Sequence, residues 1–192
     1  MCIFSLIKRG DSMLMTYKEC LEKYGSDYQL KKELKNGTIF MKAKGIYSTK
    51  RNTSEIDVIM RKYPKTVCTG KSAFYYHSLT DVIPDYYYLA TRRTDTRIND
   101  SRIIQSFIKD EIFDAGITKI QYNNSDIRIY DKERMLIELM RFRYKIPMDY
   151  YKEIVNNYRK LSFELDFGIV EDYAAMFKNG TKLMNMIQLE VL

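Results

Sequence analysis

The sequence contains no tryptophan, one histidine (His77), three cysteines and three prolines among its 192 residues. A disulfide framework or a zinc site needs several cysteines or histidines at short spacing. Cys2, Cys20 and Cys68 lie far apart and form no Cys-x-x-Cys pair. We therefore expect no disulfide, no metal site and no cofactor, in a protein that works in a reducing compartment.

Long apolar runs are also missing: none approaches the roughly 20 residues that a membrane-spanning helix needs. The apolar stretch within residues 1–10 has no basic residue before it and no small-residue cleavage site after it, unlike a signal peptide. We therefore expect a cytoplasmic protein without a membrane partner. The 45% hydrophobic and 30% charged residues, with 8 glycines, exclude collagen-like and wholly disordered chains.

The positive charge is concentrated near the N-terminus. The whole chain carries a net charge of +7, and residues 1–51 hold 11 Lys and Arg against 5 Asp and Glu, which accounts for +6 of it. This asymmetry predicts a small basic domain with a polyanionic partner, followed by a nearly neutral domain. Because residues 50–54 are polar, the predicted domains are 1–51 and 52–192.

The basic segment has the pattern of short helices followed by a hairpin. Thr16 and Glu19 have the spacing of a capping box, and Ser26 can cap a second helix that stops at Gly37. The expected elements are a helix over 3–7 that ends at Gly10, helices over 17–24 and 27–35, and strands over 38–42 and 46–48.

A tight helix pair followed by a hairpin is the outline of a winged helix-turn-helix, in which the second helix enters the DNA major groove. On that helix, Gln29 can pair with adenine and lysines can neutralise phosphates. The candidate DNA-binding residues are Ser26, Tyr28, Gln29, Lys31, Lys32 and Lys35, with Lys42 and Lys44 on the hairpin. The alternative is that this lysine-rich face is simply solvated.

The rest of the chain has a mixed pattern. Helices are expected over 56–63 and 70–79 and from residue 131 onward, strands over 66–69, 86–91 and 103–113, and a hairpin of 117–122 with 127–130. The predicted fold class is α+β: an N-terminal winged helix-turn-helix, then a mixed α/β C-terminal domain that ends in helices.

Three features of this second part could carry chemistry. Residues 69–72 end like a phosphate-binding P-loop, but Lys65 stands where that motif needs glycine. His77 is near Cys68 and Ser72 in sequence, although its apolar neighbours favour a packed, hydrogen-bonded role over a catalytic one. Residues 86–88, three tyrosines, favour packing on both faces of a strand over stacking on bases.

The predicted helix over 131–142 mixes charges of both signs beside a strongly apolar face. Glu138 can pair with Arg134 four residues before it and with Arg141 three residues after it. Such a network either stabilises the fold or faces a partner, and we favour the structural role.

Three stretches of the chain resemble the AbiEi family, the antitoxins of bacterial type IV toxin–antitoxin (abortive infection) systems, which act in phage defence. The resemblance is carried by residues 17–19, 25–37 and 44–47, then 63–65 and 72–84, and finally 127–141. No single motif is diagnostic, but the order and spacing of the three stretches are fairly specific.

The resemblance implies a winged helix-turn-helix that represses its own operon by binding inverted operator repeats, as a monomer in solution or a dimer on DNA. It implies a C-terminal antitoxin domain that counters a nucleotidyltransferase-like toxin without a stable complex, and it assigns no enzymatic activity. The protein would then be cytoplasmic and associated with the nucleoid. His77, Arg134, Glu138 and Arg141 fall in the matching C-terminal stretches, and the resemblance gives them no role.

Two other function classes stay open from the sequence. The basic domain could be a protein-interaction module that docks on the toxin or another acidic partner. An enzyme, for example a nuclease, is the third possibility, and the lack of a clustered acidic, metal or phosphate motif argues against it. The neighbouring gene would discriminate best, because a nucleotidyltransferase-like reading frame there favours the antitoxin.

Overall fold

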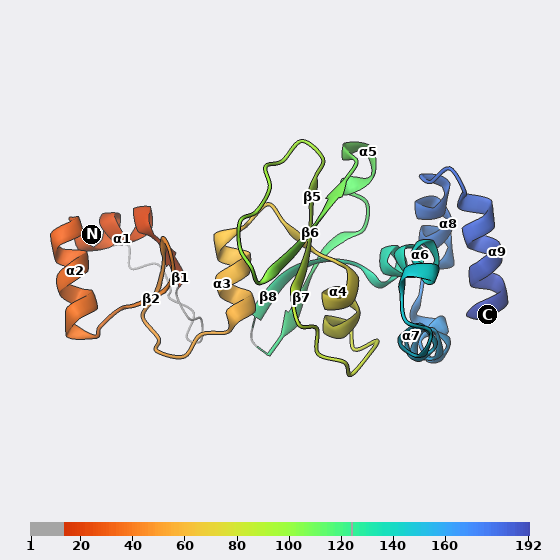
Figure 1. The fold of residues 1–192 in the computed structure, drawn as a ribbon, viewed down its shortest axis with the longest axis horizontal. Coiled ribbons are helices and arrows are strands. Elements are labelled where there is room, and N and C mark those ends of the chain that lie inside the picture. The colour runs from red at the N-terminus through yellow and green to blue at the C-terminus, as the bar shows by residue number, and fades with distance from the viewer. Residues whose placement is uncertain (1–13, 124) are drawn as a thin grey trace, which may run out of the picture. The chain divides into compact units, whose positions relative to one another are not determined.

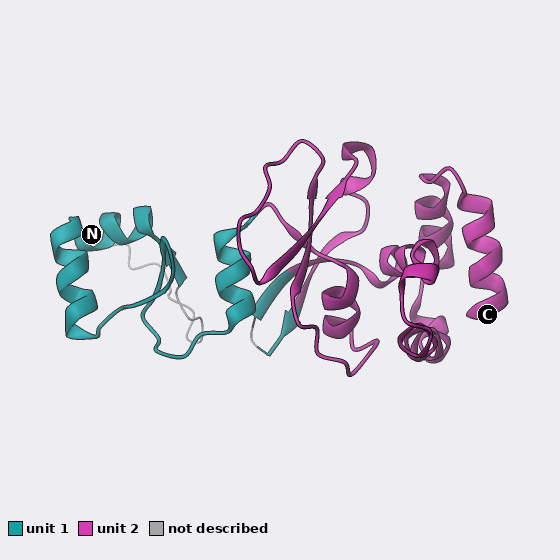
Figure 2. Cartoon of the chain, in the orientation of Figure 1, with its two compact units in different colours: residues 1–64, 121–127 teal, residues 65–120, 128–192 magenta. Residues whose placement is uncertain are grey.

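The structure, a computed structural model, describes residues 14–123 and 125–192 of the chain (Figure 1). It has a mixed α+β fold, so the α+β part of the predicted class is confirmed, while the winged helix-turn-helix stays a prediction. The chain divides into two compact units (Figure 2): unit 1 comprises Met1–Pro64 with Gln121–Ile127, and unit 2 comprises Lys65–Ile120 with Arg128–Leu192. The expected helix over 3–7 lies outside the described residues.

Unit 1 combines a three-stranded sheet with short helices. In chain order these are β1 (Leu14–Thr16), α1 (Tyr17–Tyr24), α2 (Asp27–Asn36), β2 (Phe40–Ala43), β3 (Ile46–Ser48) and α3 (Glu55–Lys62). The sheet order is β1-β3-β2, with both pairs antiparallel. The predicted helices and hairpin lie within two residues of these positions. Strand β1 was not predicted, because three residues are too few for alternation to be visible.

The predicted caps define the ends of α1 and α2. The Thr16 hydroxyl accepts a hydrogen bond from the Glu19 backbone N–H at 3.3 Å, and the Glu19 carboxylate accepts from the Thr16 N–H at 2.7 Å. The Ser26 hydroxyl accepts from the Gln29 N–H at 3.2 Å. Helix α2 ends at Gly37, whose φ of +73° is left-handed and costs glycine no steric strain.

The core of unit 1 forms where α1 and α2 meet the sheet. Its buried side chains are Met15, Cys20, Leu30, Ile39 and Tyr47. Helix α3 adds a second layer, since it packs against β1, β2 and β3 and buries its apolar side.

The compact unit therefore continues to Pro64, beyond the boundary that the sequence placed after residue 51. The polar stretch 50–54 connects two parts of one unit, because α3 contacts all three strands of the sheet to which the hairpin belongs.

Unit 2 is built on a five-stranded mixed sheet. Its strands are β4 (Val67–Cys68), β5 (Tyr87–Arg92), β6 (Ile103–Ile108), β7 (Ile117–Tyr122) and β8 (Ser125–Tyr130), in the order β6-β5-β4-β8-β7. Strand β4 runs antiparallel to β5 and parallel to β8, and β5 runs parallel to β6. The ends of β7 and β8 at the turn between them fall in unit 1.

Helices complete unit 2: α4 (Gly70–Tyr76), α5 (Asp110–Phe113), α6 (Lys132–Arg141), α7 (Met148–Lys160), α8 (Phe167–Ala175) and α9 (Gly180–Glu190). Helices α6 to α9 gather at one side of the sheet (Figure 1). Helix α6 is central among them, because it packs against α4, α8 and α9 and its residues 134–140 are all buried. No helix of the described residues is long and apolar enough to cross a membrane.

Two predicted elements of unit 2 are too long. The helix expected over 70–79 ends at Tyr76, because Ser78 takes a left-handed φ of +58° and the Leu79 N–H turns back to the Phe74 carbonyl at 2.9 Å. The strand expected over 103–113 ends at Ile108, where polar residues 109–111 begin the short helix α5. The apolar residues after 111 belong to that helix.

An ion pair between α3 and α1 makes unit 1 sensitive to acid. Arg61 of α3 donates a hydrogen bond to Glu19 of α1, and together with the Thr16 N–H it lowers the pKa of Glu19 to about 2. The carboxylate therefore contributes stability above pH 4.5, the ordinary pKa of the group, and loses it as the pH falls toward 2.

We predict that Glu19→Gln lowers the free energy of unfolding at pH 7 by up to about 1 kcal/mol, the value of an exposed ion pair. The difference from the wild type should shrink as the pH falls below 4.5. Urea unfolding followed by circular dichroism at several pH values measures it. Glu22→Gln, an exposed carboxylate on the same helix, is the control, and an equal effect of both variants would contradict the assignment.

Candidate functional sites

The first candidate site is the outward face of α2 in unit 1. Leu30 is buried in the core, whereas Tyr28 is 74% exposed and Gln29, Lys32 and Lys35 are also exposed. The sequence therefore placed the solvent face of this helix correctly. Its role in DNA binding stays a prediction.

Three of the predicted DNA-binding residues have partners within unit 1. Lys31 forms an ion pair with Asp27 at 2.6 Å, which lowers the pKa of that carboxyl. Lys42 donates a hydrogen bond to the Arg51 carbonyl, and Ser26 serves as the cap of α2. Lys31 and Lys42 would have to give up these contacts in order to bind a phosphate.

The other lysines of the set, Lys32, Lys35 and Lys44, are exposed and have no carboxylate partner within 14–123 and 125–192. Two apolar side chains outside the predicted set are exposed as well: Met41 on β2, at 63%, and Tyr17 at the start of α1, at 41%. Strand alternation could have flagged Met41, because its neighbours Phe40 and Lys42 face the other way.

A buried ion network lies at the centre of unit 2. Arg134 is fully buried and donates to the Glu138 carboxylate from Nη2 at 2.9 Å and from Nε at 3.2 Å. Its Nη1 donates to the Ile112 carbonyl at 3.0 Å, and Arg141 donates to the other oxygen of Glu138 at 2.7 Å. The predicted pairing of Glu138 with both arginines is confirmed.

Aromatic rings and a glycine enclose the Arg134 side chain. Its guanidinium carbon lies 5.1 Å from the centre of the Tyr130 ring and 4.9 Å from that of Phe177, in cation–π range. Gly116 takes a left-handed φ of +80°, and a Cβ there would lie 2.6 Å from the Arg134 Cβ. Position 116 therefore accepts only glycine without rearrangement, for reasons of both conformation and space.

His77 has the packed role that the sequence favoured. It is half-buried, and its Nε2–H donates to the Tyr130 carbonyl at 2.6 Å, while burial lowers the pKa of the imidazole. Neither predicted neighbour offers a reactive group. Cys68 is fully buried, which raises its thiol pKa and suppresses the reactive thiolate. Ser72 donates to the Tyr86 carbonyl and accepts from the Tyr88 N–H.

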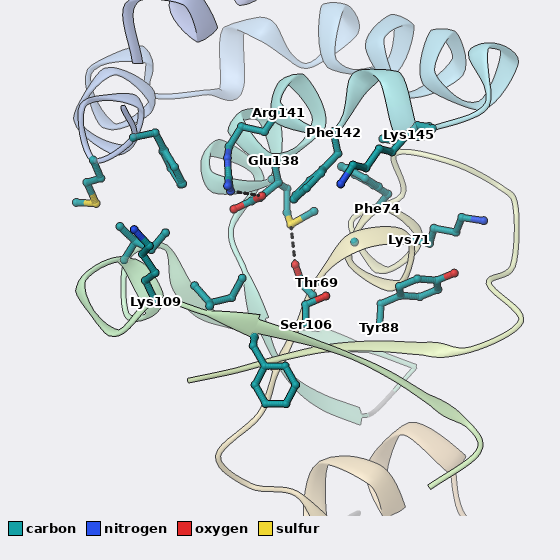
Figure 3. Close-up of a pocket in the computed structure, with 18 of the residues that line it drawn as sticks. Thr69, Lys71, Phe74, Tyr88, Ser106, Lys109, Glu138, Arg141, Phe142 and Lys145 are labelled. Carbon is teal, nitrogen blue, oxygen red and sulfur yellow. Dashed lines mark hydrogen bonds and ion pairs between the residues drawn. The ribbon is translucent and has the colours of Figure 1, made fainter. Parts of the chain in front are cut away.

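The second candidate site is an open groove of about 1190 Å³ within unit 2 (Figure 3). It is lined by residues of α4, α5, α6, β5 and β6 and of the segments after α6 and α8. Glu138 and Arg141 reach it from α6, so part of the buried ion network forms its wall. Thr69, Gly70 and Lys71 also line it, although they do not form a P-loop.

In residues 14–123 and 125–192, no three side chains of His, Cys, Asp or Glu come together in a way that could hold a metal ion. The sequence matches no protein-family model and no curated protein.

Removing the Glu138 charge tests the buried network. We predict that Glu138→Gln lowers the free energy of unfolding by about 3–5 kcal/mol, because it leaves the buried Arg134 charge without its counter-ion. Arg141→Gln is the matched control and should cost about 1 kcal/mol or less, since Glu138 then keeps Arg134. Chemical denaturation measures both, and the reverse order would show that the exposed pair is the stabilising one.

Proposed function

We propose that this protein is a DNA-binding antitoxin that represses its own operon, as the resemblance to the AbiEi family implies. Unit 1 binds duplex operator DNA, and unit 2 carries the antitoxin activity against a nucleotidyltransferase-like toxin. The proposal assigns no catalysis to the chain. Specific binding by so small a unit requires two copies on a repeated site.

The observation that carries the DNA-binding part is the exposed face of α2. It presents an amide that can read adenine (Gln29) beside lysines that can neutralise phosphates (Lys32 and Lys35). The preceding helix α1 and the hairpin β2–β3, with Lys44 at its turn, stand in the order expected of a winged helix-turn-helix. The antitoxin part is supported by the resemblance alone.

The variant Lys32→Ala/Lys35→Ala tests the phosphate contacts. Losing two contacts should weaken binding to the DNA upstream of the gene by roughly 10- to 30-fold near 0.15 M salt. The slope of log K against log salt should flatten by about 1.8. Fluorescence anisotropy with a labelled duplex, titrated at several salt concentrations, measures both quantities.

The matched control is Lys119→Ala/Lys182→Ala, which removes the same charge from exposed positions of unit 2. It should leave the salt slope unchanged. Equal binding by the wild type and by Lys32→Ala/Lys35→Ala would refute the assignment of α2 as the DNA-reading helix.

Gln29→Ala tests base reading separately from charge. It should cost about 1–3 kcal/mol on the specific site and leave the affinity for scrambled DNA unchanged, because a bidentate contact to adenine discriminates by that amount. Competition between specific and scrambled duplexes measures the ratio. If both affinities fall together, Gln29 contacts the backbone and not a base.

A protein-interaction module is the second candidate, and the exposed Tyr28 and Met41 favour it, since exposed apolar side chains are common in protein interfaces. In that case the toxin from the neighbouring gene should co-purify with the full chain. Met41→Ala should then break the complex while leaving DNA affinity intact, because Met41 is not among the candidate DNA-binding residues.

A further inference from the structure

The groove in unit 2 combines positive charge with aromatic surface. Six basic side chains line it, against two carboxylates, Glu111 and Glu138. Glu138 is already neutralised by Arg134 and Arg141. The lining cations are Lys71, Arg93, Lys109, Arg141, Lys145 and Lys178.

Most of these cations have no carboxylate partner in the part of the chain that the structure describes. Arg141 is the only one of the six that pairs with a carboxylate among the described residues. Lys71 and Lys145 instead lie near aromatic rings, 5.9 Å from the centre of Tyr150 and 5.5 Å from that of Phe142. A groove with uncompensated cations attracts an anionic ligand.

Aromatic rings lie beside the cations of the groove. Figure 3 shows Phe142 and Lys145 reaching down from the end of α6 and the turn after it, with Tyr88 and Ser106 on the sheet below them. Phe142 is 39% exposed although it borders a cavity, and the guanidinium carbon of Arg141 and the ammonium of Lys145 lie 5.2 and 5.5 Å from the centre of its ring. An exposed aromatic ring beside two cations is a combination on which a base can stack next to its phosphates.

The groove also contains a hydroxyl that lacks a strong partner. Thr69 is 7% exposed, and within residues 14–123 and 125–192 its hydroxyl has one hydrogen-bond partner, the Met135 sulfur at 3.9 Å, a weak acceptor. A buried hydroxyl usually finds a better partner. A sugar or base group of a ligand would supply it.

From these observations we infer that the groove binds a nucleotide, with the base stacked against Phe142 and the phosphates held by Lys145 and Lys71. Aromatic faces next to cations are the combination with which proteins bind unpaired nucleotides. An acidic peptide would use the cations but would leave the aromatic faces and the Thr69 hydroxyl without a role. The groove volume of about 1190 Å³ is above the roughly 300–1,000 Å³ of common small-molecule sites, so a nucleotide has room to fit.

The nucleotide could be free or part of a single strand. Figure 3 shows Lys109 at the other end of the groove from Lys71 and Lys145. A free nucleotide needs only one end, whereas a strand would extend toward Lys109. This inference concerns unit 2 alone and does not depend on DNA binding by unit 1.

Titration calorimetry on the full chain tests the inference, with ATP, GTP, CTP, UTP and a four-residue thymidine oligonucleotide as probes. At least one probe should bind, and Phe142→Ala and Lys145→Ala should each weaken it roughly tenfold or more. The matched controls are Tyr144→Ala, an 89% exposed aromatic outside the groove, and Lys182→Ala. Both should stay within twofold of the wild type.

Lys109→Ala separates the two sources. If the ligand is a strand, this variant should weaken binding of the oligonucleotide and leave binding of the nucleoside triphosphates unchanged. If the ligand is a free nucleotide, it should change neither affinity much. Circular dichroism confirms that each variant is folded. Lys32→Ala/Lys35→Ala should bind the probes as the wild type does, which keeps this test apart from that of the proposed function.

Three results would overturn the inference. They are the absence of binding by every probe at 1 mM, equal losses in the groove and control variants, and binding of a polyglutamate peptide or of tripolyphosphate as tight as that of the best nucleotide. The last result would define a general anion site in place of a nucleotide site.

Discussion

A buried guanidinium stays charged at any physiological pH, so each of its nitrogens needs an acceptor inside the protein. Arg134 meets this constraint with Glu138 on its own helix and with the Ile112 carbonyl at the end of α5. It lies between the rings of Tyr130 and Phe177 and against Gly116. Strand β8, helix α5 and the segment after α8 are thereby all placed relative to α6.

The same network has a second effect at the surface of unit 2. Glu138 forms ion pairs with both Arg134 and Arg141, so one negative charge is shared by two positive charges. The wall of the groove therefore carries a net positive charge even though its carboxylate is nearly buried. The interaction that fixes α6 in the core thus also sets the electrostatic character of the groove beside it.

Local signals in the sequence predicted much of the fold. Capping residues such as Thr16 and Ser26, and glycines such as Gly37, act within a few residues, so their outcome is readable from spacing. The pairing of Glu138 at i−4 and i+3 is readable for the same reason. The extent of unit 1 cannot be read from such local signals, because the contact of α3 with the sheet joins residues far apart in the chain.

The α2 face could be predicted from the sequence, whereas the groove could not. Tyr28, Gln29 and Lys32 share one helix, so helical periodicity alone groups them. Lys71, Lys109 and Lys145 come from three separate segments, and only the fold brings them to one cavity. Residues 52–192 hold 21 basic and 20 acidic residues, a nearly neutral sum. The net charge of a segment predicts the charge of a surface only where residues close in sequence are also close in space. The near-zero net charge of residues 52–192 therefore does not predict the charge of the groove.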